Sequence, residues 1–379
     1  MKLVVQVRLL PDAEQARRLK ETIERCNAAA TFVGEIAFEH RTANVFELRK
    51  LCYHEVREKF GLSSQQAQLA IKAVSDAYKR DKSRKVSFRP LAAIPFDVRT
   101  MSFKGLDRVS LLTLAGRILV PMLVGRYQAE RIPRAKGQCD LVSRKGKWFL
   151  FVTIDVPEGS PTDPDDFLGV DLGVEEIATD SDGNRHSGSD VEDVRRKHNL
   201  QRKRLQRRGT KGSRKKLKRV SGKEARFRRH KNHVISKRIV ESAKGTGRGI
   251  AVEDLRYIRD RITARGSEAR NRLSGWSFGQ LYAFLAYKAQ LAGVPIEVVD
   301  PAYTSQTCAA CGHCRKSNRK SQSEFVCKAC GHRAHADKNA ARNIRARALA
   351  KRALELAVDE AKAGASRTAA ETSRKSHTL

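Results

Sequence analysis

Length, composition and charge restrict the class of protein before any motif is considered. The chain has 379 residues, enough for two or three domains, and its 40% hydrophobic content is sufficient for sizeable cores. Lys and Arg number 76 against 42 Asp and Glu, a formal charge of +34 that favours nucleic acid as partner over an anionic membrane surface. The sequence has no apolar run of membrane-spanning length and no signal-peptide pattern, so we expect a cytoplasmic protein with no membrane partner.

The first half is predicted to be a β domain interrupted by helices. Residues 2–9 alternate between apolar and polar side chains, which is typical of a half-buried strand. Helical periodicity then predicts an insert at 11–83. Strand patterns return after it, so the β domain is expected to comprise 1–10 and 84–157. Pro, Gly and Asp dominate 158–166, which predicts a linker.

The second half has short apolar strands alternating with helices. This pattern predicts an α/β core over 167–302 and 336–363. A cysteine-rich segment, 303–335, separates the two parts of the core. The polar last segment, 364–379, is expected to be disordered.

A strongly basic helical insert is expected at 195–245. Residues 195–238 contain 21 Lys or Arg and one acid, a charge of about +20 that would repel itself without counterions. Three glycines, Gly209, Gly212 and Gly222, predict two helices rather than one. An ordinary solvated helix face is the alternative to nucleic-acid contact. The candidate phosphate contacts are Arg195, Arg196, Lys203, Arg204, Arg207, Lys215, Lys216, Arg228 and Arg229.

Four cysteines have the spacing of a zinc ribbon. Two Cys-x2-Cys pairs are separated by 15 residues, and a glycine follows each pair. Four thiolates complete a tetrahedral site, so one zinc ion is expected in a structural role. Unliganded reduced thiols are the alternative. The predicted ligands are Cys308, Cys311, Cys327 and Cys330, with Cys314 as a spare thiol.

Three acids have the placement of a two-metal nuclease. Asp171 and Glu253 each follow an apolar strand, and Asp337 begins a helix with the sequence DKNAARNI. Divalent cations prefer oxygen ligands, and two ions about 4 Å apart clamp the attacking water and the leaving oxygen. A helix cap or a solvated turn explains any one of these acids more simply. The residues alone do not decide between Glu253 and its neighbour Asp254.

Together these motifs resemble the TnpB (OrfB) proteins of bacterial insertion sequences, which are relatives of the type V CRISPR effectors. FLGVDLGVEEIATDSDG, GIAVEDL, TSQTCAACGHC, FVCKACGH and HADKNAARNI occur in the family's order over about 165–345. The resemblance implies a multidomain fold: a wedge-like β-barrel with a helical recognition insert, then an RNase H-like (RuvC) nuclease core with an inserted zinc ribbon. It is weaker over the first half of the chain.

The resemblance also implies an activity and its residues. It implies Mg²⁺-dependent, RNA-guided endonuclease cleavage of double-stranded DNA, with the guide RNA coming from the element's own end and no small-molecule substrate. The catalytic acids would be Asp171, Glu253 rather than Asp254, and Asp337, which would hold two Mg²⁺ ions. The four predicted zinc ligands keep their assignment. A protein of this family is expected to associate with the nucleoid when bound to DNA.

Base pairing to the guide reads most of the target in this family, and the protein reads a short flanking motif. We expect the residues that recognise this flanking motif to lie on the helix beginning at Ser63, because glutamine can hydrogen-bond to adenine in the major groove. Ordinary helix-surface residues are the alternative. The candidates are Gln65, Gln66, Gln68 and Lys72.

Two other functions use the same features. A transposase would perform strand transfer at the acidic site. A catalytically silent RNA-guided repressor would bind DNA without cutting it, although such a protein would be free to lose the three acids. Cleavage of matched DNA in Mg²⁺ by protein carrying its co-purified RNA separates these functions.

Overall fold

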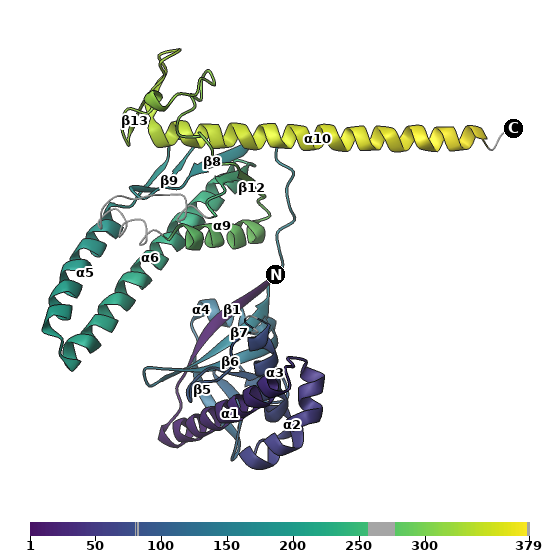
Figure 1. Ribbon diagram of the computed structural model, residues 1–379, viewed down its shortest axis with the longest axis vertical. Helices are drawn as coiled ribbons and strands as arrows, with labels where there is room; N and C mark the ends of the chain where they lie inside the picture. Colours follow the sequence, from purple (N-terminus) through teal and green to yellow (C-terminus); the bar gives the residue numbers. More distant parts are fainter. Residues whose placement is uncertain (80, 82, 257–276, 377–379) are drawn as a thin grey trace. The chain divides into compact units, whose positions relative to one another are not determined.

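The computed structural model describes residues 1–79, 81, 83–256 and 277–376, with side chains described up to 359 (Figure 1). The described chain divides into two compact units, Met1–Pro157 and Glu158–Leu379. Each unit has its own hydrophobic core. No helix in the described ranges is both long and apolar enough to cross a bilayer.

The first unit is a curved antiparallel sheet packed against helices. Among the described residues its strands run in the order β2-β6-β7-β1-β5-β4-β3. β1 lies in the middle, because it pairs with β7 along its whole length and with β5 at its end. The strands are β1 (Lys2–Leu9), β2 (Ile94–Phe96), β3 (Met101–Lys104), β4 (Arg108–Thr113), β5 (Gly116–Leu123), β6 (Ala135–Arg144) and β7 (Lys147–Asp155).

Helices fill the sequence between β1 and β2, as the periodicity predicted. They are α1 (Ala13–Glu39), α2 (Val45–Phe60) and α3 (Ser64–Tyr78); α4 (Arg126–Ala129) and η1 (Ile132–Arg134) follow β5. Asp12 caps α1 and Ser63 caps α3, each through its side chain in a reciprocal capping box with the glutamine three residues later. Their apolar faces and the inner face of the sheet form one core.

The second unit is built on a mixed sheet in the order β10-β9-β8-β11-β12. β8, β11 and β12 are parallel to one another, β9 is antiparallel to β8, and β10 is antiparallel to β9. The strands are β8 (Phe167–Asp171), β9 (Glu176–Asp180), β10 (Arg185–Ser187), β11 (Gly249–Glu253) and β12 (Ile296–Val299). Because neighbouring residues of a strand face opposite ways, Leu168 and Val170 belong to one core and Phe167 to another.

Helices cover both faces of this sheet (Figure 1). α6 (Lys211–Gly245) and α9 (Phe278–Ala292) pack on one face, and α10 (Ala336–Ser376) packs on the other. α5 (Ser189–Arg208) and α6 form an antiparallel hairpin. The break between them is at Gly209, which has a positive φ of 62°, whereas Gly212 and Gly222 lie within α6.

Three features differ from the sequence expectations. The second half of α6 is part of the core, through Ile235 and Ile239 among others, so it is more than a basic insert. The expected linker packs on this unit through Asp166, which forms an ion pair with Arg345. α10 continues to Ser376, so the structure describes 364–376 as helix where the sequence pattern predicts disorder. Residues 377–379 lie outside the described residues.

The ribbon segment lies between β12 and α10. It contains η2 (Lys316–Asn318) and a two-stranded antiparallel sheet of β13 (Glu324–Val326) and β14 (Arg333–His335). The fully buried Asn318 ties the segment together: its amide donates to the carbonyls of Gln306 and His313, and its oxygen accepts from the backbone N–H of Lys328.

Candidate functional site

The three predicted acids come from three elements of the second unit. β8 and β11 are paired in register, so Asp171 and Glu253 end neighbouring parallel strands at the same edge of the sheet. Asp337 is the second residue of α10, which packs across β8 and β11. Asp171 and Glu253 line a pocket at this edge together with Arg319 and Thr304. The fold therefore places Asp171 and Glu253 side by side at this edge, near the start of the helix that carries Asp337.

Burial makes this cluster of carboxyls electrostatically unfavourable. The pKa of Asp171 lies well above its usual value, because burial penalises the charged form and because Glu253 and Asp337 add negative charge nearby. Burial also raises the pKa of Glu253 and of Asp337. Desolvated, mutually repelling carboxyls of this kind are typical of functional sites, and a bound cation would relieve the repulsion.

Two residues of the ribbon segment partly compensate the acids. Arg319 forms an ion pair with Asp337, with 3.2 Å between Nη2 and Oδ1. The buried hydroxyl of Thr304 donates a hydrogen bond to Oε1 of Glu253. Neither residue stands out in the sequence, because Arg319 is one of several basic residues in its loop and Thr304 lies 51 positions from its partner.

The structure separates Glu253 from its neighbour. Glu253 acts on the pKa of Asp171, whereas Asp254 forms an ion pair with Arg256, with 2.6 Å between Nη2 and Oδ2. This arrangement favours Glu253 as the second acid. Among the described residues, one group has its ligand atoms close enough together to hold a metal ion, and it consists of the four ribbon cysteines. The three acids are not as closely spaced.

The four predicted cysteines do meet. Their Sγ atoms all lie within 4.8 Å of one another, with 3.8 Å from Cys308 to Cys330 and 3.6 Å from Cys311 to Cys327. A zinc tetrahedron with Zn–S bonds of about 2.3 Å has S–S edges of about 3.8 Å, so the donor set fits this ion. Backbone N–H groups of Cys330 and Ala329 lower the pKa of Cys327 to about 6, whereas the neighbouring thiols raise the pKa of Cys311 to about 12. Cys314 lies outside the cluster.

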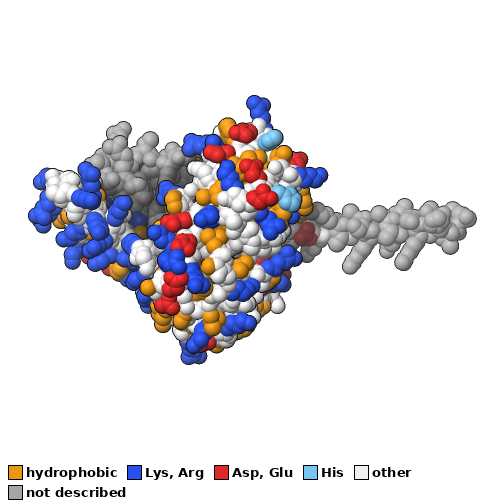
Figure 2. Space-filling view, turned by 90° about the horizontal axis from the view of Figure 1, so that it is seen from below, with side chains coloured by type: hydrophobic (Ala, Val, Ile, Leu, Met, Phe, Trp, Pro, Cys, Tyr) orange, Lys and Arg blue, Asp and Glu red, His pale blue; other side chains and the backbone are white. Residues whose placement is uncertain are grey.

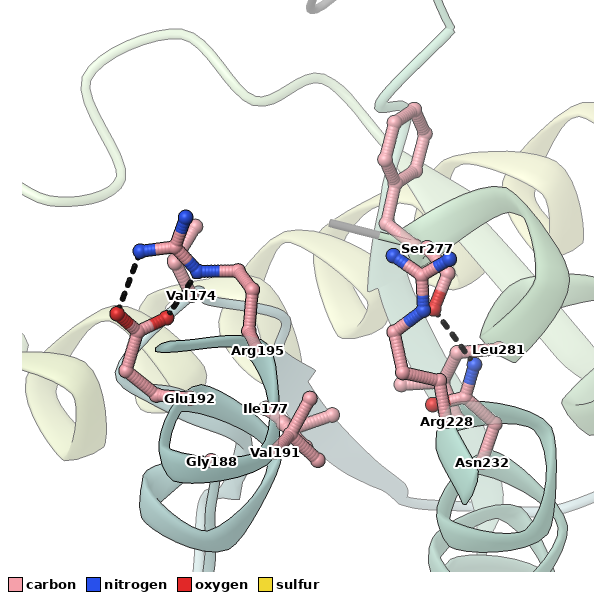
Figure 3. Close-up of a pocket in the computed structure, with 11 residues that line it drawn as sticks. Val174, Ile177, Gly188, Val191, Glu192, Arg195, Arg228, Asn232, Ser277 and Leu281 are labelled. Atoms are coloured by element: carbon pink, nitrogen blue, oxygen red, sulfur yellow. Dashed lines mark hydrogen bonds and ion pairs between the residues drawn. The ribbon is translucent and has the colours of Figure 1, made fainter. Parts of the chain in front are cut away.

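The candidate phosphate contacts lie on the α5–α6 hairpin. Figure 2 shows Lys and Arg side chains gathered over its projecting end. Most of the candidate phosphate contacts are exposed, namely Arg196, Lys203, Arg204, Arg207, Lys215, Lys216 and Arg229. Arg195 is not, which corrects the expectation for it. Arg195 is 8% exposed and forms an ion pair with Glu192. Both residues line a pocket between α5, α6 and α9, and Arg228, on the opposite side of this pocket, is half-buried (Figure 3).

The candidate readers on α3 have different environments. Gln66 is 6% exposed and forms the capping box with Ser63, so its side chain is unavailable to DNA; this corrects the expectation. Gln65 is bonded to Asp97 and to Arg99. Gln68 is half-buried and Lys72 is exposed, paired with Asp76. The Ser-x-x-Gln pattern that signals a capping box was visible in the sequence.

Comparisons with known proteins identify the family of the chain. Residues 150–258 match the OrfB_IS605 family model, described as "Probable transposase", and residues 278–344 match the "Cas12f1-like, TNB domain" model. The "Putative RNA-guided DNA endonuclease InsQ" of Escherichia coli (strain K12) is 31% identical over 74% of this chain and 73% of its own length. The chain belongs to the TnpB (OrfB) family.

Other relatives extend this TnpB assignment. The CRISPR-associated endodeoxyribonuclease Cas12f1 of Sulfoacidibacillus thermotolerans is 35% identical over 61% of this chain, and the matched region spans 56% of that relative's length. A solved Cas12f1–sgRNA–target DNA complex contains a chain that covers 91% of this one, with a TM-score of 0.66 and 15% identity. That likeness shows that the TnpB chain has a Cas12f-like fold.

Proposed function

We propose that this TnpB protein is an RNA-guided DNA endonuclease of a bacterial transposable element. It cuts DNA that matches its guide RNA, next to a short flanking motif. One observation carries the proposal: β8 and β11 end in Asp171 and Glu253 at the same edge of the sheet, and Glu253 and Asp337 both act on the charge of the buried Asp171. The printed names of its relatives, InsQ and Cas12f1, support the guide and the substrate.

The strand order supports an RNase H-like (RuvC) core. Numbered within the sheet, the strands run 3-2-1-4-5, with the first and fourth parallel and each ending in an acid. We propose that Asp171, Glu253 and Asp337 hold two Mg²⁺ ions. When bound, such ions activate the attacking water and stabilise the leaving oxygen.

Other residues of the chain assist at this site. Arg319 places a fixed positive charge beside Asp337, where it stabilises the negative charge that gathers on a phosphate under attack. The four ribbon cysteines hold one structural zinc ion, which fixes the segment that carries Arg319 and Thr304. The exposed Lys and Arg of α5 and α6 hold nucleic-acid phosphates without reading sequence.

Purified protein with its co-purified RNA provides the test. The RNA is sequenced, and matched and unmatched DNA duplexes are incubated with the complex in Mg²⁺. We expect cleavage of the matched duplex. Asp171→Ala, Glu253→Ala and Asp337→Ala should each abolish cleavage and leave target binding nearly intact, because pairing and phosphate contacts supply the affinity. Asp254→Ala is the matched control and should retain most of the activity.

The outcomes separate the alternatives. Binding without cleavage by the wild-type complex would indicate a silent repressor. Joining of DNA ends would indicate a transposase. A cleaving Asp171→Ala protein would refute the assigned acids, and an inactive Asp254→Ala beside an active Glu253→Ala would move the second ligand by one residue.

A further inference from the structure

Thr304 links the ribbon segment to one catalytic acid. It is 3% exposed and lies four residues before the first ribbon cysteine, Cys308. Its hydroxyl hydrogen-bonds to Oε1 of Glu253 and also lies 3.2 Å from the carbonyl oxygen of Pro301. A hydroxyl has one proton, and an ionised carboxylate is a stronger acceptor than a carbonyl. The geometry therefore fixes one oxygen of Glu253 from the side of the ribbon.

Two buried amides of α10 hold the backbone of this segment. Nδ2 of Asn343 donates to the carbonyl oxygens of Thr304 at 2.8 Å and of Thr307 at 2.7 Å. Nδ2 of Asn339 also donates to Thr307, at 2.7 Å, and its oxygen accepts from the N–H of Ala309 at 3.0 Å. Asn339 is fully buried and Asn343 is 7% exposed. The two lie four residues apart, which places them on one face of the helix.

These bonds connect the places where the site is assembled. α10 carries Asp337 at its start, and the same helix holds the backbone of the residue that touches Glu253. Apolar side chains would be sufficient to pack α10 against this segment. Buried asparagines add hydrogen bonds that fix the position of the segment's backbone relative to the helix. The bonds therefore fix Glu253 relative to the helix that presents the third acid.

We propose that Thr304 is a positioning residue for Glu253, that Asn343 holds the backbone of Thr304, and that Asn339 holds the residues that follow it. This inference rests on the proposed function, because it takes Glu253 as a metal ligand. A carboxylate that is free to rotate must be ordered when the cation binds. Groups that orient a ligating side chain typically contribute about 10- to 100-fold in metal affinity or activity.

Thr304→Val removes the hydroxyl and keeps the shape of the side chain. We expect Mn²⁺ affinity, measured by electron paramagnetic resonance on the RNA-bound protein, to fall about 10- to 100-fold, with a parallel loss of DNA cleavage. The unfolding midpoint should shift by no more than about 4 °C, because the variant loses a single hydrogen bond and keeps the shape of the side chain. Thr304→Ser keeps the hydroxyl and should restore most of the affinity.

Thr246→Val is the matched control. It removes a hydroxyl that donates to the carbonyl oxygen of Ser242 at 2.9 Å, at the end of α6. Mn²⁺ affinity should not change in this variant. A fall equal to that of Thr304→Val would overturn the inference, because the effect would then not depend on contact with Glu253.

Asn343→Ala tests the second step independently of the stability of Thr304→Val. This variant keeps the hydroxyl of Thr304 but releases the backbone of Thr304, so Mn²⁺ affinity should again fall. The Thr304→Val/Asn343→Ala double variant should lose less affinity than the sum of the losses in the two single variants. Wild-type Mn²⁺ affinity in Asn343→Ala or in folded Thr304→Val would overturn the inference, even where wild-type protein cleaves matched DNA. Failure of the wild-type protein to cleave would instead count against the proposed function.

Discussion

Gly169→Ala tests whether the separation of β8 and α10 sets the geometry of the acids. Gly169 precedes Asp171 by two residues and faces α10. A Cβ atom at this position would lie 2.0 Å from the carbonyl oxygen of Ala341 and 2.7 Å from the backbone nitrogen of Arg345. Both atoms belong to the backbone of the helix that begins next to Asp337, so no side-chain rotation relieves the contact. Ordinary contact begins at 3.4 Å, so relieving the contact with Ala341 requires the strand and helix to separate by about 1.4 Å.

The separation predicts a large loss of activity with a moderate loss of stability. A misplacement of about 1 Å at a catalytic site costs about 100-fold in rate, and overpacking costs about 1–3 kcal/mol of unfolding free energy. Single-turnover cleavage of matched DNA and urea unfolding measure the two effects. Gly245→Ala at the end of α6 is the control, because its Cβ meets nothing within 4 Å. Wild-type cleavage and stability in Gly169→Ala would refute the reasoning.

Two further predictions concern the cysteines and pH. Cys308→Ser should release zinc and locally unfold the ribbon, as elemental analysis and proteolysis would detect, whereas Cys314→Ser should keep its zinc; equal damage from both would contradict the ligand set. Because the pKa of Asp171 is raised in the folded state, its contribution to stability is present below its unfolded pKa and is lost as pH rises through the folded pKa. Asp171→Asn should therefore stabilise the protein in EDTA at pH 8 more than at pH 5, and a variant less stable than wild type at pH 8 would contradict this.

Short-range rules were sufficient for the parts of the site that each occupy one segment. Asp171 and Glu253 each end an apolar strand. Their proximity required only that the two strands be parallel neighbours. Cysteine spacing was sufficient for the ribbon cluster, because its four thiols come from two tight turns. The helix carrying the third acid was visible from its Ala-rich composition. In each case local spacing determines the geometry.

Contacts between distant segments could not be read in this way. Nothing in the sequence selects Arg319 among its basic neighbours, because its ion pair with Asp337 depends on how Asn318 folds the loop. Charge alone placed Arg195 on the surface, although Glu192 lies three residues away and pairs with it in a partly buried position. The error for Gln66 arose from treating a capping residue as a surface one.

The position of the ribbon in the chain follows from the same contacts. It is inserted between the end of β12 and the start of α10, so one end of the insertion brings Thr304 to Glu253 and the other end leads directly into Asp337. A loop folded around a metal ion is more rigid than a loop of that length without one, since metal binding supplies folding free energy. Its Arg319 can then stay beside desolvated carboxyls whose mutual repulsion would otherwise separate them. On the proposed function, we therefore expect disruption of the ribbon to impair cleavage, because Arg319 and Thr304 would lose their fixed positions beside Asp337 and Glu253.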